Sequence, residues 1–272
     1  MWLCLYSFLL SYLLFPAFVD LLVRGELVGE NYRGEKLPLG MGLIILFVSA
    51  LTLITTLPLY WRDWEREGLA LLFFLVLLGL LGLLDDVAGR EKVKGLRGHL
   101  SYLLSQGRIS TGLLKGVGGV GGSFFVSLLL ADSPSGFLQG GLLLSLSINA
   151  MNLLDLRPGR AIKAFLVLML LAFIGSGGKG PFFLFSSVIG AALAYFPFDL
   201  RGQVMLGDPG ANVLGGIAGL ALLWSLSPWQ RMLAITFLAL LHGFCEAHSL
   251  TRTIEAIPVL NFLDRLGRPK EP

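Results

Sequence analysis

Charged residues are scarce in this chain of 272 residues, of which they make up only 14%. A soluble domain normally carries about 25% charged residues, so the composition excludes an ordinary soluble globular protein. Cysteine is scarce too. Cys4 and Cys245 both lie in apolar runs, which argues against a disulfide framework or a zinc site and favours buried apolar thiols. The net charge of +3 is too small to indicate a nucleic-acid partner.

Long apolar runs are what the chain has in abundance, since 55% of its residues are hydrophobic. A helix needs about 20 apolar residues to cross the hydrocarbon core of a bilayer, and the runs are close to that length. The first run, Trp2 to Val23, has neither a basic leading segment nor a small-residue cleavage site, so we expect a retained span rather than a signal peptide.

We therefore predict an all-α polytopic membrane bundle that forms one transmembrane domain over residues 1–272. No soluble domain, internal repeat or long linker is recognisable. The nine expected spans are approximately residues 2–23, 38–60, 68–84, 112–131, 137–154, 161–175, 181–197, 211–227 and 229–249.

Basic residues indicate the orientation. With nine spans, the connections alternate sides, and those after odd-numbered spans hold 17 of the 21 Lys and Arg residues. Lys and Arg that flank spans stay cytoplasmic. The N-terminus is therefore expected outside and the C-terminus inside, with the longer, chemically richer connections on the cytoplasmic face.

A pair of acids ends the third expected span, in "GLLDDVAGREKVKG". Two adjacent carboxylates, Asp85 and Asp86, are unfavourable against the dipole at a helix C-terminus. The basic residues that follow leave open a second interpretation, in which the acids belong to a solvated, salt-bridged loop.

Amides and a further acid end the fifth expected span, in "INAMNLLDLRPGRAI". Asn149, Asn152 and Asp155 are spaced i, i+3, i+6, which keeps them within about 60° on one helix face, so that they can converge on a ligand. Alternatively, the amides bond neighbouring helices.

Asp208 precedes the eighth expected span, in "MLGDPGANVLGG", where a turn or N-cap role is the simple alternative. His242, Glu246 and His248 lie near the end of the last span without an HExxH motif, and we interpret these histidines as buried or interfacial.

The acid motifs all fall on one predicted side of the membrane at a similar depth. Ionisable groups at membrane depth indicate a functional site. Carboxylate and amide oxygens suit Mg²⁺ better than zinc, and basic residues including Lys94, Lys115 and Arg160 would supply positive charge for phosphates. Together these features predict phosphoryl transfer between a soluble nucleotide and a lipid.

The motifs "LLDD…KGLRGH", "NAMNLLD" and "MLGDPGANVLGG" resemble, in this order and spacing, the polyprenyl-phosphate N-acetylhexosamine-1-phosphate transferases. This superfamily includes the phospho-MurNAc-pentapeptide translocase and the GlcNAc-1-phosphate transferases that begin teichoic-acid and O-antigen synthesis. The resemblance implies a multi-pass enzyme of the bacterial inner membrane. In its Mg²⁺-dependent reaction, for which Mn²⁺ is a second candidate, polyprenyl (undecaprenyl) phosphate attacks a UDP-sugar and UMP is released. The resemblance does not fix the oligomeric state, which can be a monomer or a homodimer.

The resemblance also implies roles for individual residues. Asp85, Asp86 and Asp208 are the expected catalytic acids, the first two beside the lipid phosphate as a base or an orienting pair. Asn152 and Asp208 are the expected Mg²⁺ ligands. The expected substrate-binding residues are Lys94, Asn149, Asp155, Arg157 and Arg160.

Two substitutions depart from the family pattern. Leu156 stands where the family commonly has the first Gly of D-G-x-D-G, and Pro158 stands at its second Asp. The last loop also lacks the His-His-His motif of the muramyl-pentapeptide enzymes, which argues against that substrate. We expect Arg157 and Arg160 to bind a substrate diphosphate; the alternative is a structural ion pair with Asp155.

Because the acids and Asn152 are retained, we expect an active transferase. One alternative is an inactive relative that binds lipid-linked sugar or scaffolds envelope assembly. A transporter is disfavoured, since transporters place their binding groups near the midplane of the membrane.

Overall fold

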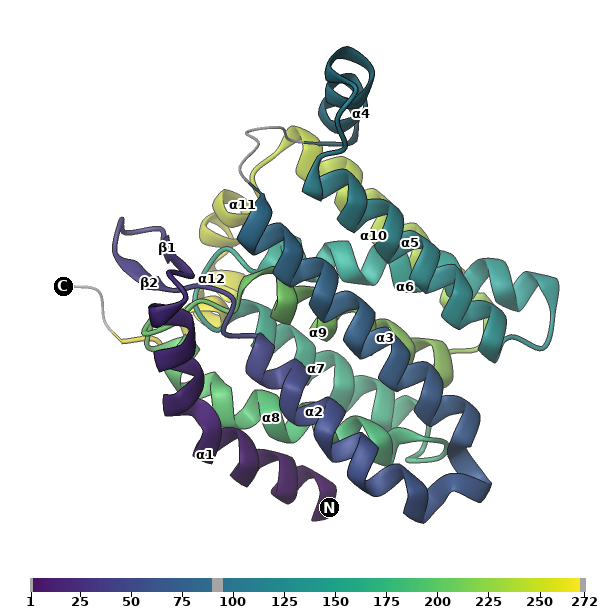
Figure 1. The fold of residues 1–272 in the computed structure, drawn as a ribbon. Coiled ribbons are helices and arrows are strands. Elements are labelled where there is room, and N and C mark those ends of the chain that lie inside the picture. Colours follow the sequence, from purple (N-terminus) through teal and green to yellow (C-terminus); the bar gives the residue numbers. More distant parts are fainter. Residues whose placement is uncertain (1, 90–94, 270–272) are drawn as a thin grey trace.

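A computed structural model describes residues 2–89 and 95–269 of the chain (Figure 1). They form a helical bundle with one short antiparallel hairpin. The helices are α1 (Trp2–Arg24), α2 (Leu43–Thr56), α3 (Trp61–Ala88), α4 (Gly95–Gln106), α5 (Thr111–Leu130), α6 (Pro134–Leu154), α7 (Arg160–Gly175), α8 (Phe182–Leu200), α9 (Gly207–Ser225), α10 (Pro228–Ala247), α11 (Leu250–Ala256) and α12 (Pro258–Arg265), with a 3-10 turn η1 (Leu57–Tyr60) between α2 and α3.

The hairpin consists of β1 (Val28–Glu30) and β2 (Lys36–Pro38), with Val28 opposite Pro38. Asn31 organises its turn, because the Asn31 side-chain oxygen accepts hydrogen bonds from the backbone N–H groups of Arg33 and Glu35. The all-α expectation is confirmed for the bundle, and this short hairpin is a local feature of the connection between α1 and α2.

Each of the nine expected apolar segments contains a helix, but the expected count of nine spans is not confirmed. Among the described residues, five helices are long and apolar enough to cross a membrane: α1, α3, α5, α6 and α8. A sixth span results if α10 and α11, bent by 98°, count as one. With 14 and 16 residues, α2 and α7 are shorter than the roughly 20 residues that a straight crossing needs. The predicted orientation of the termini stays a prediction.

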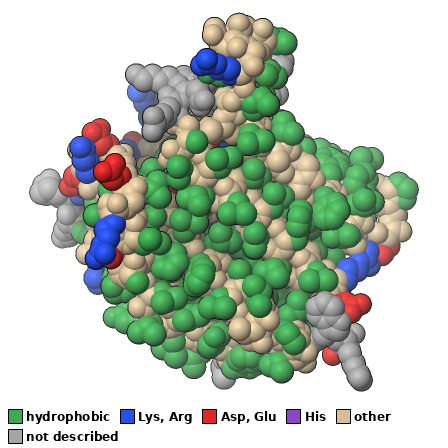
Figure 2. Space-filling model, viewed as in Figure 1, with side chains coloured by type: hydrophobic (Ala, Val, Ile, Leu, Met, Phe, Trp, Pro, Cys, Tyr) green, Lys and Arg blue, Asp and Glu red, His purple; other side chains and the backbone are tan. Residues whose placement is uncertain are grey.

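The surface fits a membrane protein. Figure 2 shows hydrophobic side chains spread over the faces of the helices, while charged side chains gather at the margins of the view. Large apolar side chains such as Leu13 and Phe237 are mostly exposed. In water such an extended apolar surface would drive association, whereas lipid covers it at no cost.

The core of the bundle is α9, which packs against α3, α6 and α7 and is buried along nearly its whole length. Small residues make this close packing feasible. A Cβ atom at Gly215 would lie 2.7 Å from the Ile148 Cα atom of α6, so that only glycine fits there. The N-terminus of α9 is thereby held beside the ends of α3 and α6, where the sequence motifs lie.

Candidate active site

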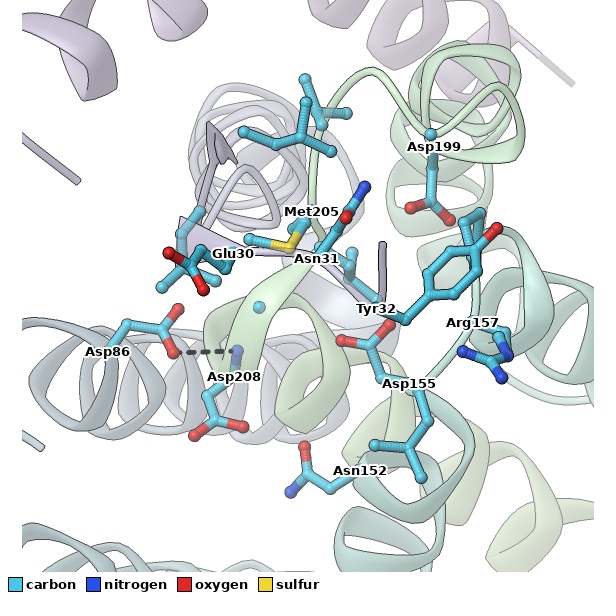
Figure 3. Close-up of a pocket in the computed structure, with 18 residues that line it drawn as sticks. Glu30, Asn31, Tyr32, Asp86, Asn152, Asp155, Arg157, Asp199, Met205 and Asp208 are labelled. Carbon is cyan, nitrogen blue, oxygen red and sulfur yellow. Dashed lines mark hydrogen bonds between the residues drawn. The ribbon is translucent and has the colours of Figure 1, made fainter. Parts of the chain in front are cut away.

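The site is built around the first turn of α9. Gly207 adopts φ +70°, and a Cβ atom there would overlap both the Asp86 carboxylate and the Gly40 backbone. Only glycine combines this left-handed conformation with such a close approach. Asp86 Oδ1 accepts a hydrogen bond from the Asp208 backbone N–H at 3.4 Å (Figure 3). The "GDPG" sequence therefore brings Asp208 beside the acid pair that ends α3.

A cavity of about 500 Å³ opens at this junction. Its polar lining comes from the hairpin, from the ends of α3, α6 and α8, and from α9: Glu30, Asn31, Tyr32, Asp86, Asn152, Asp155, Arg157, Asp199 and Asp208. Within the described part of the chain, the charged residues of this lining are five acids and one base, Arg157. An anionic substrate would need additional positive charge to enter such a pocket.

Lys115 of α5 links two of the acid motifs. Its Nζ atom lies 2.9 Å from Asp85 Oδ2 and 2.6 Å from Asp208 Oδ2. The three side chains remain 18–29% exposed, so the ion pairs stay accessible from solvent. Lys115, predicted to supply charge for phosphates, is thus held by two carboxylates with which a phosphate would compete.

Two oxygen atoms of the site are buried and have no hydrogen-bond partner among the described residues: Asp86 Oδ2 and Asn152 Oδ1. The Asn152 amide nitrogen donates to Asn212 Oδ1 at 2.7 Å, which leaves its carbonyl oxygen free. Buried polar atoms without partners are uncommon in folded proteins and point to a ligand. Carboxylate and amide oxygens are the donors that Mg²⁺ prefers.

The described residues contain no group of three or more His, Cys, Asp or Glu side chains close enough together to hold a metal ion. A cation here would therefore rely on the Asn152 oxygen, one or two carboxylates, and oxygens from water or a substrate phosphate. Mg²⁺ is commonly bound in this way, with few protein ligands. The oxygen set fits Mg²⁺ on these terms.

Asp155 lies just beyond the end of α6 and lines the same pocket. Burial raises the pKa of Asp155 well above its usual range, and the neighbouring carboxylates of Asp199, Asp208 and Asp86 raise it further. An acid in this position favours the protonated form until a cation arrives to stabilise its charge.

Asp199, near the end of α8, was missed by the sequence analysis. It is only 4% exposed, and its Oδ2 atom accepts a hydrogen bond from the Gly159 N–H at 2.8 Å. The rule that selected Asp85 and Asp86, an acid at the predicted cytoplasmic end of an apolar run, would also have selected Asp199. Tyr32 carried no comparable signal in the sequence.

Arg157 lies beside Tyr32 and away from the Asp86–Asp208 pair (Figure 3). Its guanidinium carbon is 4.3 Å from the centre of the Tyr32 ring, and its Nη2 atom is 3.4 Å from Glu255 Oε1 of α11. The pocket thus has an acidic side near Asp86 and Asp208 and a side where a guanidinium covers an aromatic ring.

Other predicted site residues lie elsewhere. Arg160 does not line the pocket; it is 5% exposed and makes a two-pronged ion pair with Asp264, at 2.7 and 2.9 Å. Arg160 therefore forms a structural ion pair, which was the alternative to substrate binding, but its partner is Asp264 rather than Asp155. Asn149 is exposed on the outer stripe of α6 that includes Leu142, so it does not converge with Asn152. Lys94 lies outside the described residues.

Two comparisons with known proteins bear on this site. Residues 68–226, more than half of the chain, match the sequence profile described as Glycosyl transferase family 4. The chain is also similar to the phospho-N-acetylmuramoyl-pentapeptide-transferase of Enterococcus faecalis (strain ATCC 700802 / V583). The two are 27% identical over 199 residues, which cover 65% of this chain and 58% of that relative. The profile match includes Asp85, Asp86, Asn152, Asp155 and Asp208 and ends before α10.

Proposed function

Because this chain belongs to glycosyl transferase family 4, we propose that it transfers a sugar-1-phosphate from a UDP-sugar to a polyprenyl phosphate and releases UMP. The family is the one that the motifs predict. The observation that carries the proposal is the convergence of Asp86, Asn152, Asp155 and Asp208 on one pocket at the end of an apolar bundle. A pocket in this place can receive a soluble nucleotide and a lipid phosphate together.

We assign Mg²⁺, or Mn²⁺ in its place, to Asn152 and Asp208, with the unpartnered Asp86 Oδ2 atom close by. When bound, the metal would neutralise the diphosphate of the sugar nucleotide and orient it. Lys115, which is paired with Asp208, would be available to donate to a phosphate oxygen if a cation took its place beside Asp208. Lys94 is proposed as a second phosphate contact.

Asp85 and Asp86 are assigned to the acceptor lipid. A phosphate monoester has a second pKa of about 6, so the acceptor is already largely a dianion at neutral pH and needs little help from a base. We therefore favour the orienting role, in which Asp86 and the Lys115–Asp85 pair fix the direction of attack. Phosphoryl transfer depends mainly on such positioning and on charge neutralisation.

The nucleotide is assigned to the other side of the pocket, beside Asp155, Arg157 and Tyr32. Leu156 and Pro158 line this side, so the two departures from the family pattern change the surface that the donor would meet. We infer an N-acetylhexosamine donor other than the muramyl-pentapeptide nucleotide. The activity belongs to cell-envelope glycan synthesis at the inner membrane of a bacterium.

The test is a direct assay of the purified chain in lipid nanodiscs with undecaprenyl phosphate, a panel of UDP-sugars and Mg²⁺. We expect one donor to give UMP and a lipid-linked sugar in equal amounts, and omission of either the lipid phosphate or the metal to abolish both. Absence of UMP with every donor would overturn the proposal in favour of the non-catalytic alternative.

A further inference from the structure

The C-terminal segment, defined as α11, α12 and the residues to Arg268, forms a buried ionic cluster with the start of α7. Asp264 accepts hydrogen bonds from Arg160 through both carboxylate oxygens and from Arg268 Nη2 at 2.7 Å. Arg160 Nη1 also donates to Thr251 Oγ1 at 3.0 Å. None of its residues lines the pocket, and Thr251, Asp264 and Arg268 lie beyond residues 68–226, which match the family profile and include Arg160.

Lys163 closes the same junction from α7. Its Nζ atom donates to the carbonyl oxygens of Leu263 and Leu266, at 2.9 and 3.2 Å. These carbonyls lie at the end of α12, where a helix leaves its last carbonyl groups without partners. The C-terminal segment is therefore attached to α7 by side-chain contacts at both of its short helices.

The backbone of the pocket loop, defined as residues 155–159 between α6 and α7, makes hydrogen bonds with two side chains from elsewhere in the chain. On one side, Asp199 Oδ2 accepts from the Gly159 N–H at 2.8 Å. On the other side, Arg268 Nε donates to the Pro158 carbonyl oxygen at 2.7 Å. Because proline has no backbone N–H, the carbonyl oxygen is the only backbone group of Pro158 that can form a hydrogen bond.

A further contact reaches the functional side of the loop. Glu255 of α11 lies 3.4 Å from the Arg157 guanidinium, which in turn covers the Tyr32 ring. No residue of the C-terminal segment lines the pocket, yet the segment contacts the Pro158 backbone and the Arg157 side chain, which do. Its effect on the site must therefore pass through the pocket loop.

We propose that the C-terminal segment is a clamp that holds the pocket loop, with Arg268 and Asp264 as positioning residues that set Asp155 and Arg157 for binding of the nucleotide sugar. The proposal rests on the function proposed above. It assigns nucleotide-site geometry to a part of the chain beyond the family match, and it gives Arg160 a role through Asp264 rather than through the substrate.

The test uses Arg268→Lys, which keeps the charge beside Asp264 but removes the planar guanidinium whose Nε atom binds the Pro158 carbonyl. Arg265→Lys is the matched control, because Arg265 lies on the same segment and is exposed. Hydrogen–deuterium exchange is measured on the whole chain in nanodiscs, in the peptide that covers residues 155–163. UMP release is then measured as a function of UDP-sugar concentration.

In Arg268→Lys we expect faster exchange of the Gly159 and Arg160 amides and a KM for the UDP-sugar raised about tenfold, with kcat within about twofold of wild type. Peptides at the start of α9 should exchange as in wild type, and Arg265→Lys should match wild type throughout. If Arg268 only stabilised the fold, Arg268→Lys would lower the thermal unfolding midpoint but would not raise KM while kcat stayed near the wild-type value.

The two readouts separate the clamp from the proposed function. Unchanged exchange in the pocket loop overturns the clamp whatever the activity. Faster exchange with an unchanged KM overturns the link to substrate binding. If the wild type releases no UMP from any donor, the proposed function fails. Binding of UMP to wild type and Arg268→Lys, measured by calorimetry, then decides the clamp, and equal affinities overturn it.

Discussion

Two ionic clusters flank the pocket, and they are built in opposite ways. The Lys115 cluster joins one base to two acids, Asp85 and Asp208, and its side chains are 18–29% exposed. The Asp264 cluster joins one acid to two bases, Arg160 and Arg268, and its side chains are 5–13% exposed. The first lies within the family match, whereas in the second Asp264 and Arg268 lie beyond the match and Arg160 lies within it.

The difference in burial separates a cluster that can exchange partners from one that cannot. Solvent and ligands can compete for Lys115 at a modest cost, because its contacts are partly exposed. Burial alone would raise the pKa of Asp264, but the guanidinium groups of Arg160 and Arg268 hold it below its usual range. An ion pair this well covered and hydrogen-bonded on both carboxylate oxygens keeps one arrangement.

The largest expected effect comes from breaking the buried cluster. Asp264→Ala leaves Arg160 and Arg268 without their shared carboxylate, and removal of one partner from a buried ion pair costs about 3–5 kcal/mol. We expect a marked fall in the thermal unfolding midpoint in detergent. Asp132→Ala, at a side chain that is 95% exposed, is the control. Equal midpoints for the two variants would show that the cluster contributes nothing to stability.

Breaking the accessible cluster should affect activity and leave stability intact. Asp208→Asn removes a charge from the proposed metal site and from the contact with Lys115, and we expect turnover to fall about 100-fold or more with a weaker response to Mg²⁺. Thermal unfolding midpoints measure the stability, and Mg²⁺ titrations of UMP release measure the activity. Asp132→Asn is the control for both measurements. Normal turnover with an unchanged titration would assign Asp208 to its turn-capping alternative.

The two arginines of the pocket region sharpen the same comparison. Arg157→Ala should raise the KM for the UDP-sugar about tenfold with little change in stability, because Arg157 lines the pocket and its ion pair is partly exposed. Arg160→Ala should instead lower the unfolding midpoint. Arg201→Ala, at an exposed arginine, is the control for both. The reverse pattern would contradict the division between the two clusters.

The smallest expected effect depends on pH. Because the pKa of Asp155 is raised in the folded chain, the unfolded chain loses this proton first as the pH rises above about 4, and folding is progressively disfavoured until the folded pKa is reached. Asp155→Asn removes this penalty. We therefore expect a variant that unfolds a few degrees higher than wild type at neutral pH, with the difference shrinking toward pH 4, and that has lost activity.

Thermal unfolding of both proteins across this pH range measures the effect, with Asp132→Asn as the reference. A difference that does not change with pH would mean that Asp155 titrates normally in the folded state.

The acid motifs were recognisable in the sequence because each is short and ends an apolar run, so their spacing along the chain already implies a shared membrane face. Asp86, Asn152, Asp155 and Asp208 do line one pocket. The same reasoning misplaced Asn149, because helical spacing gives the angle between two residues and not the direction in which the helix faces. On α6 that direction is set by packing against α5, α9 and α10.

Hydropathy and motif order alone determined the membrane class, the family and three of the five acids that line the pocket, because these properties are encoded within single segments of the chain. Tertiary packing decided the rest. Arg160 pairs with Asp264 across 104 residues, and Lys115 reaches Asp208 across 93. Whether a buried arginine meets a carboxylate or a substrate depends on which segments the bundle brings into contact, and no local pattern carries that information.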